Sequence, residues 1–257
     1  MVSSDQHELI ESWRREERLP FIGWDFSYLE SSGRMIEEQA PWSYTARAAE
    51  LLQRSAAALD MGTGGGERLL KLRTHWPRKV VATEDYPPNF ALATARLATL
   101  GVTVVRAELS NHALLPFADG EFDLVLNRHS GFNCHEVARM LAPGGTFFTQ
   151  QVDGLWAHDL MAIFGAQPKW PEATLARNGP KLEAAGLTLL HTEAWAGKLT
   201  FTDIGAIVYY LRAVPWLVPG FSVDTHLAGL LRLQDPLDNG RGLVFAARKY
   251  LIEARKT

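Results

Sequence analysis

A glycine-rich turn between a predicted strand and a predicted helix is the part of this sequence best suited to chemistry. Residues 58–66 read Ala-Leu-Asp-Met-Gly-Thr-Gly-Gly-Gly, so the acid Asp60 precedes four glycines, and a helical pattern follows at 67–72. A helix that starts directly after such a turn points its free backbone N–H groups at a ligand. Glycine suits the turn because it has no Cβ to block a close approach. The turn therefore predicts a site for a nucleotide-like ligand.

Two glycine spacings compete to describe this turn. The dinucleotide fingerprint G-x-G-x-x-G/A begins at Gly62 but meets Glu67 where its third Gly or Ala belongs. A carboxylate in the first helical turn would repel a bound pyrophosphate. The pattern acid-x-Gly-x-Gly-x-Gly is met in full from Asp60 to Gly66. The second spacing therefore fits the turn better than the first.

Another acid ends the next predicted strand, at residues 79–83. Glu84 follows this strand directly and lies one β-α-β step after the turn. An ionised carboxylate forms charge-assisted hydrogen bonds and can accept two of them at once. Asp85 is the alternative candidate for the ligand-binding acid, although it could instead be a solvated turn acid. Dinucleotide enzymes place an acid similarly, so this feature does not separate the two spacings.

The elements that must position these residues alternate regularly along the chain. After the strand before the turn, strands are predicted at 79–83, 102–107, 122–127, 146–152, 187–195 and 242–248. Helices are predicted between them at 88–100, 133–141 and 171–185. This alternation predicts an α/β fold with a doubly wound, mostly parallel, seven-stranded sheet. Ligands of such sheets bind at the carboxyl ends of the strands, where the turn and Glu84 lie.

Two further stretches narrow the family. Residues 115–125 read Leu-Pro-Phe-Ala-Asp-Gly-Glu-Phe-Asp-Leu-Val, and Pro-Gly-Gly follows at 143–145. With the turn and Glu84 they give four ordered matches across residues 56–152. This stretch resembles the class I, Rossmann-like S-adenosylmethionine (SAM)-dependent methyltransferases, in particular the small-molecule type. The resemblance implies SAM as cofactor, S-adenosylhomocysteine as product, and in-line displacement of the methyl group.

The resemblance also implies roles for individual residues. In that family the turn contacts the cofactor, here through Asp60, Gly62, Thr63, Gly64 and Gly66. Glu84, or its neighbour Asp85, would hold the ribose hydroxyls. Asn111 or Glu108 would bind the adenine amine, although the usual Gly-Asp is missing from this stretch. Asn127 begins the loop that faces the methyl group.

That loop, Asn127-Arg128-His129-Ser130, bears on the methyl acceptor. It lacks the Asn/Asp-Pro-Pro-aromatic sequence of enzymes that methylate amino groups of DNA and RNA bases. His129 is the candidate catalytic residue, because histidine can act as a general base near neutral pH. The alternative is that His129 only hydrogen-bonds nearby backbone. We expect a small-molecule acceptor, with O-, N- and C-methylation all open.

Composition limits the other possibilities. The 257 residues carry a formal net charge of −3, which gives no electrostatic footprint for nucleic acid. The single cysteine, Cys134, excludes an internal disulfide, and no spacing of histidines or cysteines predicts a metal site. The polar N-terminus and the lack of a long apolar run favour a cytoplasmic protein without membrane spans. The oligomeric state is left open.

The chain is expected to form one methyltransferase domain, 1–257. Residues 1–45 would form an N-terminal helical lid and 46–197 the SAM-binding core. An insertion at 198–240 would lie on the substrate side, and 241–257 would hold the last strand and a tail. Two other functions stay open: an NAD(P)-dependent Rossmann oxidoreductase, and a SAM-binding protein without turnover.

Overall fold

A computed structural model describes residues 4–21 and 24–257 of the chain. The chain divides into two compact units. The core unit comprises residues 41–153, 172–195 and 249–257, and the accessory unit comprises residues up to 40, 154–171 and 196–248. The N-terminal segment and the insertion, expected separately as a lid and a substrate-side element, thus belong to the same unit.

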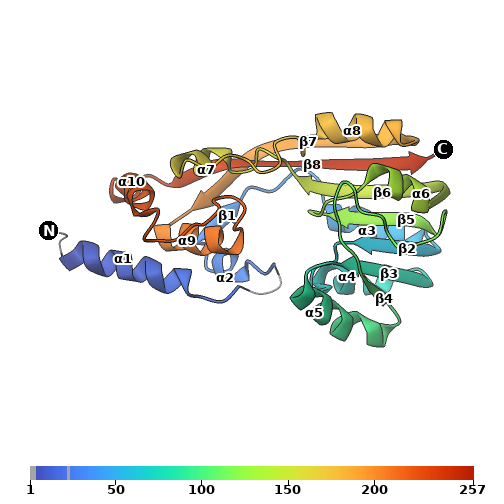
Figure 1. Ribbon diagram of the computed structural model, residues 1–257, viewed down its shortest axis with the longest axis horizontal. Helices are drawn as coiled ribbons and strands as arrows, with labels where there is room; N and C mark the ends of the chain where they lie inside the picture. The colour runs from blue at the N-terminus through green and yellow to red at the C-terminus, as the bar shows by residue number, and fades with distance from the viewer. Residues whose placement is uncertain (1–3, 22–23) are drawn as a thin grey trace. The chain divides into compact units, whose positions relative to one another are not determined.

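The sheet follows the order β1-β7-β8-β6-β5-β2-β3-β4. Its strands are β1 Met35–Glu37, β2 Ala57–Met61, β3 Lys79–Glu84, β4 Thr103–Arg106, β5 Phe122–Arg128, β6 Leu141–Val152, β7 Leu187–Phe201 and β8 Leu243–Lys256. In the core unit β4, β3, β2, β5 and β6 pair in parallel, and β8 pairs with β6 antiparallel (Figure 1). The predicted α/β, mostly parallel sheet is confirmed.

The predicted count of seven strands is wrong, because the described residues form a sheet of eight. The additional strand is β1, which lies in the segment expected to be a helical lid. It pairs antiparallel with β7, from Met35 opposite Phe201 to Glu37 opposite Leu199. This pairing is possible because β7 continues to Phe201, past Trp195, where the predicted strand ended.

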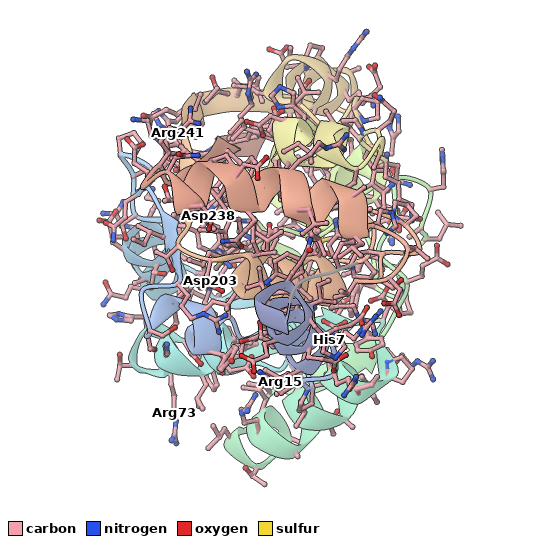
Figure 2. The ribbon with its side chains drawn as sticks, turned by 90° about the vertical axis from the view of Figure 1, so that its left-hand side faces the viewer. His7, Arg15, Arg73, Asp203, Asp238 and Arg241 are labelled. Carbon is pink, nitrogen blue, oxygen red and sulfur yellow. The ribbon has the colours of Figure 1, made fainter. Side chains whose placement is uncertain are left out.

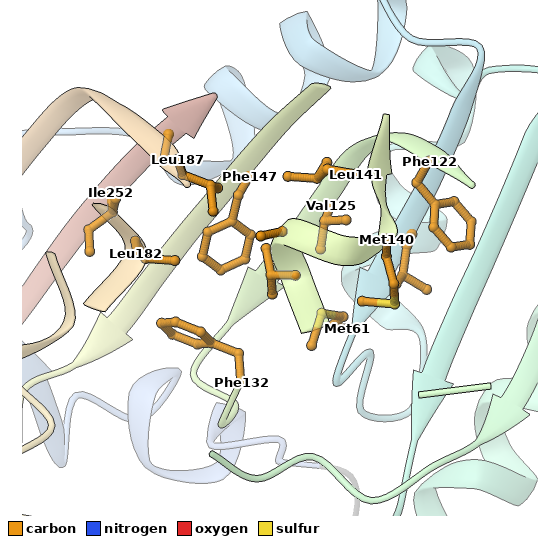
Figure 3. Close-up of a cluster of buried hydrophobic side chains, with 14 of the residues drawn as sticks. Met61, Phe122, Val125, Phe132, Met140, Leu141, Phe147, Leu182, Leu187 and Ile252 are labelled. Atoms are coloured by element: carbon orange, nitrogen blue, oxygen red, sulfur yellow. The ribbon is translucent and has the colours of Figure 1, made fainter. Parts of the chain in front are cut away.

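Helices cover both faces of the core sheet. They are α3 Tyr44–Gln53, α4 Glu67–Lys71 and α5 Pro87–Leu97 on one face, and α6 Cys134–Met140 and α8 Leu175–Ala184 on the other. Strand residues alternate between the two, as a pleated sheet requires. Ala58 of β2 packs with α3, whereas its neighbour Leu59 packs with α6 and α8. Figure 3 shows the second cluster, in which Phe147, Val125 and Leu182 are fully buried.

The accessory unit contains α1 Ser4–Glu17, α2 Ser27–Glu30, α7 His158–Ile163, α9 Ile204–Ala213 and α10 Leu227–Asp238. Arg34 connects its elements through ion pairs of 2.8 Å to Glu16 and 2.7 Å to Asp203. These side chains line a cavity of about 290 Å³, whose acids Asp203 and Asp238 are labelled in Figure 2. Within the described ranges, no helix is long and apolar enough to cross a membrane.

Candidate cofactor site

The predicted turn connects β2 to α4 at the carboxyl end of the parallel strands. Gly62 has a φ of 73°, and a Cβ added there would lie 2.5 Å from the side chain of Ser130. Gly66 has a φ of 83°, and a Cβ added there would lie 2.9 Å from the side chain of Leu97 on α5. Gly62 must be glycine because the loop after β5 packs against it, and Gly66 must be glycine because α5 packs against it. The positive φ expected for this turn is present, whereas the close approach of a ligand to it stays a prediction.

The carboxylate of Glu84 holds this turn against the end of β3. Its Oε2 accepts a hydrogen bond of 2.8 Å from the Gly64 N–H. Its Oε1 accepts from the N–H groups of Tyr86, at 3.0 Å, and Asp85, at 3.2 Å. Glu84 is buried, whereas Asp85 is exposed. Glu84 therefore ties the two loops together, and a carboxylate with about four acceptor positions has about one left for a ligand.

The electrostatics of Glu84 follow from its place. Burial raises the pKa of Glu84, and the neighbouring charge of Asp85 acts in the same direction, while the N–H groups of Tyr86 and Gly64 oppose them. A buried acid of this kind favours a ligand that donates hydrogen bonds or carries positive charge.

Asp60 is the second acid at this edge of the sheet. It lies on β2, opposite Ala82 of the neighbouring β3, and is only partly exposed. Burial raises its pKa to about 6, although the positive charges of Arg68 and Arg128 oppose the rise. A carboxylate whose charge is incompletely compensated lies next to the glycine turn, and this favours a cationic group nearby.

Asn127 and Asn111 differ sharply in their surroundings. Asn127 is fully buried, donates from Nδ2 to the Met61 oxygen at 3.3 Å, and accepts from the Thr149 hydroxyl at 2.9 Å. Its side chain is thus engaged in holding β2, β5 and β6 together, and its contact with the cofactor stays a prediction. Asn111 is exposed and forms no side-chain hydrogen bond with the described residues, so its adenine contact also stays a prediction.

His129 follows β5 at the same edge. It adopts a φ of 57°, a left-handed conformation that is uncommon for residues other than glycine. Its Nε2 lies 2.9 Å from the Nε2 of Gln150 on β6. Burial lowers the pKa of His129 well below its usual range, and the charges of Arg128 and Lys249 act in the same direction. By surface area His129 is nonetheless exposed to solvent.

The sequence did not single out two residues of this edge. Gln150 is buried, and its Oε1 accepts the indole N–H of Trp42 at 2.8 Å. Asn89, in the first turn of α5, is 1% exposed, and its amide oxygen and nitrogen find no hydrogen-bond partner among the described residues. The signal for both was a polar side chain at a position whose spacing predicts burial: Gln150 lies two residues after Phe148 in the strand, and Asn89 shares a helix face with Ala93.

Comparisons with known proteins identify a methyltransferase domain within the core unit. Residues 59–149 match the family model of the methyltransferase domain. Over 80 residues the chain is 38% identical to the release factor glutamine methyltransferase of Mycolicibacterium smegmatis. That alignment covers 31% of this chain, and the chain spans only 28% of the relative's length.

Solved structures share the fold at low identity. The YcgJ protein of Bacillus subtilis is 16% identical, with a TM-score of 0.59 over 83% of this chain and 97% of its own. The [4+2]-cyclase SpnF is 15% identical, with a TM-score of 0.52 over 99% of this chain and 96% of its own. At these identities the likeness shows a common fold.

Proposed function

We propose that the chain, whose residues 59–149 match the methyltransferase domain, is a class I SAM-dependent methyltransferase that binds SAM on the turn after β2 and methylates a small molecule. The observation that carries the proposal is the clamp between Glu84 and the Gly64 N–H. It joins the glycine turn to the acid after the next strand, within the segment that matches the methyltransferase domain.

The chemistry of this edge fits SAM in two respects. The glycine turn, with positive φ at Gly62, Gly64 and Gly66, presents backbone without side chains at this edge. Asp60 and Glu84, both acids with raised pKa values, offer negative charge and acceptor oxygens. SAM carries an ammonium, a positive sulfur and ribose hydroxyls. We therefore assign Asp60 to the cationic amino-acid end and Glu84 to the ribose, with one free acceptor position available before any backbone N–H is displaced.

The proposed contribution of the protein to the reaction is positional. When bound, SAM supplies an electrophilic methyl group on sulfur. The chain's own residues would hold the reacting groups in line, which is worth up to several orders of magnitude in rate. Asn127 supports this edge by fixing Met61, the last residue of β2, through the 3.3 Å hydrogen bond. His129 is the proposed group nearest the acceptor.

A small-molecule acceptor is the form of the proposal that the chain supports best. The loop after β5 lacks the Pro-Pro-aromatic sequence of DNA and RNA amino-methylating enzymes, and the net charge is −3. The substrate of the release factor methyltransferase is not transferred to this chain, because so little of that relative is matched. Nucleic acid is proposed not to be a partner, and a reducing, cytoplasmic location is proposed from the single cysteine.

Binding and methyl transfer need separate tests, because the fold alone does not define the reaction. SpnF, whose fold is similar, is a [4+2]-cyclase. We expect calorimetry to show binding of SAM and S-adenosylhomocysteine and no binding of NAD. Binding of NAD without SAM would refute the proposal in favour of the oxidoreductase. Transfer is tested by incubating labelled SAM with a panel of hydroxyl, carboxyl and amine acceptors. SAM binding without transfer to any member would favour the SAM-binding protein without turnover.

A further inference from the structure

Three side chains from separate parts of the core unit form a hydrogen-bonded chain that ends at His129. The indole Nε1–H of Trp42, which precedes α3, donates to Oε1 of Gln150 at 2.8 Å. The Gln150 Nε2 in turn lies 2.9 Å from the His129 Nε2. Gln150 is only 6% exposed, so its amide depends on partners within the protein. The His129 backbone N–H also donates to the Gln150 backbone oxygen at 2.9 Å.

The indole determines the direction of each hydrogen bond in this chain. An indole N–H can only donate, so Gln150 must turn its carbonyl oxygen toward Trp42 and its NH₂ group toward His129. An NH₂ group can also only donate. The Nε2 of His129 must therefore accept with its lone pair, and the one proton of the neutral imidazole lies on Nδ1.

We propose that Trp42 and Gln150 hold His129 as the neutral Nδ1–H tautomer, so that it donates a hydrogen bond to the methyl acceptor and is not available as a base. The assignment of the tautomer stands on the hydrogen bonds alone, whereas the role toward the acceptor rests on the proposed function. The acceptors that fit carry an oxygen or nitrogen lone pair beside the reacting atom. Their nucleophile arrives already deprotonated or passes its proton to another group.

The surroundings of the ring support this role. No described residue hydrogen-bonds the Nδ1 of His129, and His129 is exposed to solvent, so its N–H is free for a ligand. Protonating Nε2 would place its N–H against the NH₂ group of Gln150, and turning that amide would place the NH₂ group against the indole N–H. The charged groups around the ring, Arg128 on β5, Lys249 on β8 and Arg68 on α4, are all positive and also oppose a second proton.

The test is the tautomer itself, measured by ¹⁵N NMR of the histidine side chains in the intact protein without cofactor. The His129 signal is assigned by its loss in His129→Asn. We expect Nδ1–H and a neutral ring between about pH 6 and 8. An Nε2–H tautomer, or a ring that becomes cationic in this range, would overturn the proposal. Since neither SAM nor acceptor is present, failure of the chain to bind SAM leaves this result unaffected.

Two variants test the cause. In Trp42→Phe the Gln150 amide is free to turn, so we expect Nε2–H to become populated and the ring to titrate within the same pH range. In Gln150→Glu the carboxylate accepts from both neighbours, so the tautomer should change to Nε2–H. Trp76→Phe is the matched control, because it removes another indole hydrogen bond of the core unit, the 3.0 Å bond to the Leu69 oxygen. An unchanged His129 in Gln150→Glu, with the fold intact by circular dichroism, would refute the relay.

Discussion

Asp60→Asn is expected to make the protein more stable at neutral pH while weakening its binding of SAM. In the folded chain burial raises the pKa of this carboxyl from 3.8 to about 6. At about 1.36 kcal/mol per pH unit, ionising Asp60 is then roughly 3 kcal/mol costlier in the folded than in the unfolded protein. Because Asp60 is partly exposed, we reduce the expected gain to about 1–3 kcal/mol. Asparagine has nearly the same shape and removes this cost.

The sign of the effect depends on pH in a defined way. Between about pH 4 and 6 the folded protein binds more protons at Asp60 than the unfolded chain does, so its stability falls as pH rises. Above pH 6 the cost is complete, and below pH 4 both states are protonated. The advantage of Asp60→Asn should therefore be full at pH 7.5 and disappear toward pH 4.

The assay is urea unfolding followed by circular dichroism, for both proteins at pH 4, 5, 6 and 7.5. A variant that is no more stable than the parent at pH 7.5, or a difference that is the same at every pH, would refute the reasoning. Calorimetry of SAM on the same proteins tests the functional half. We expect the variant to lose about 1.5–3 kcal/mol of affinity, the usual value of a hydrogen bond to a charged group. A more stable variant with unchanged SAM affinity would show that the buried charge of Asp60 does not contribute to SAM binding.

Three more outcomes are expected. SAM affinity of the parent protein should fall up to tenfold per unit as pH drops below about 6, because Asp60 must lose its proton to hold a cation; a Kd constant from pH 5 to 7.5 would contradict this. Glu84→Gln places an NH₂ group against the N–H of Gly64 or Tyr86 and should weaken SAM binding roughly 10- to 150-fold by calorimetry, with Asp85→Asn as the control that changes little. Gly62→Ala places a Cβ 2.5 Å from Ser130 at a residue with positive φ, so it should lower the free energy of unfolding by about 1–3 kcal/mol. An unchanged urea midpoint would rule out this strain.

The central fold was predictable because its signals are local. Apolar strands and amphipathic helices have different periods, and each turn carries its own glycine or proline. The end of the chain shows where this fails. Residues 249–257 read as a charged tail, yet β8 continues to Lys256 through them. Glu253 is buried there because Arg47 of α3 holds its two oxygens at 2.7 and 2.8 Å. A charge neutralised by a residue two hundred positions away leaves no local pattern.

Two other elements escaped for related reasons. The strand β1 has only three residues and exists through its pairing with β7. The helix α10 contains Gly229 and Pro236, both weak helix formers, so the sequence indicated only an insertion there. In both cases tertiary contacts outweigh local propensity, and only those contacts define the element.

The same distinction applies to the site: features within one stretch of sequence were predicted, and contacts between distant stretches were not. The turn and Glu84 were found because each is attached to one strand end, whereas the relay that fixes His129 joins residues from three elements. One step of that relay was nonetheless accessible. Once β5 and β6 are taken as parallel neighbours, Arg128 pairs with Gln150, and the buried amide of Gln150 needs a hydrogen-bond partner near the end of β5. The Trp42 step was not accessible, because nothing in the sequence brings Trp42, which lies two positions before α3, to Gln150 on β6. Yet this indole determines which nitrogen of His129 carries the proton, and with it whether the residue donates or accepts.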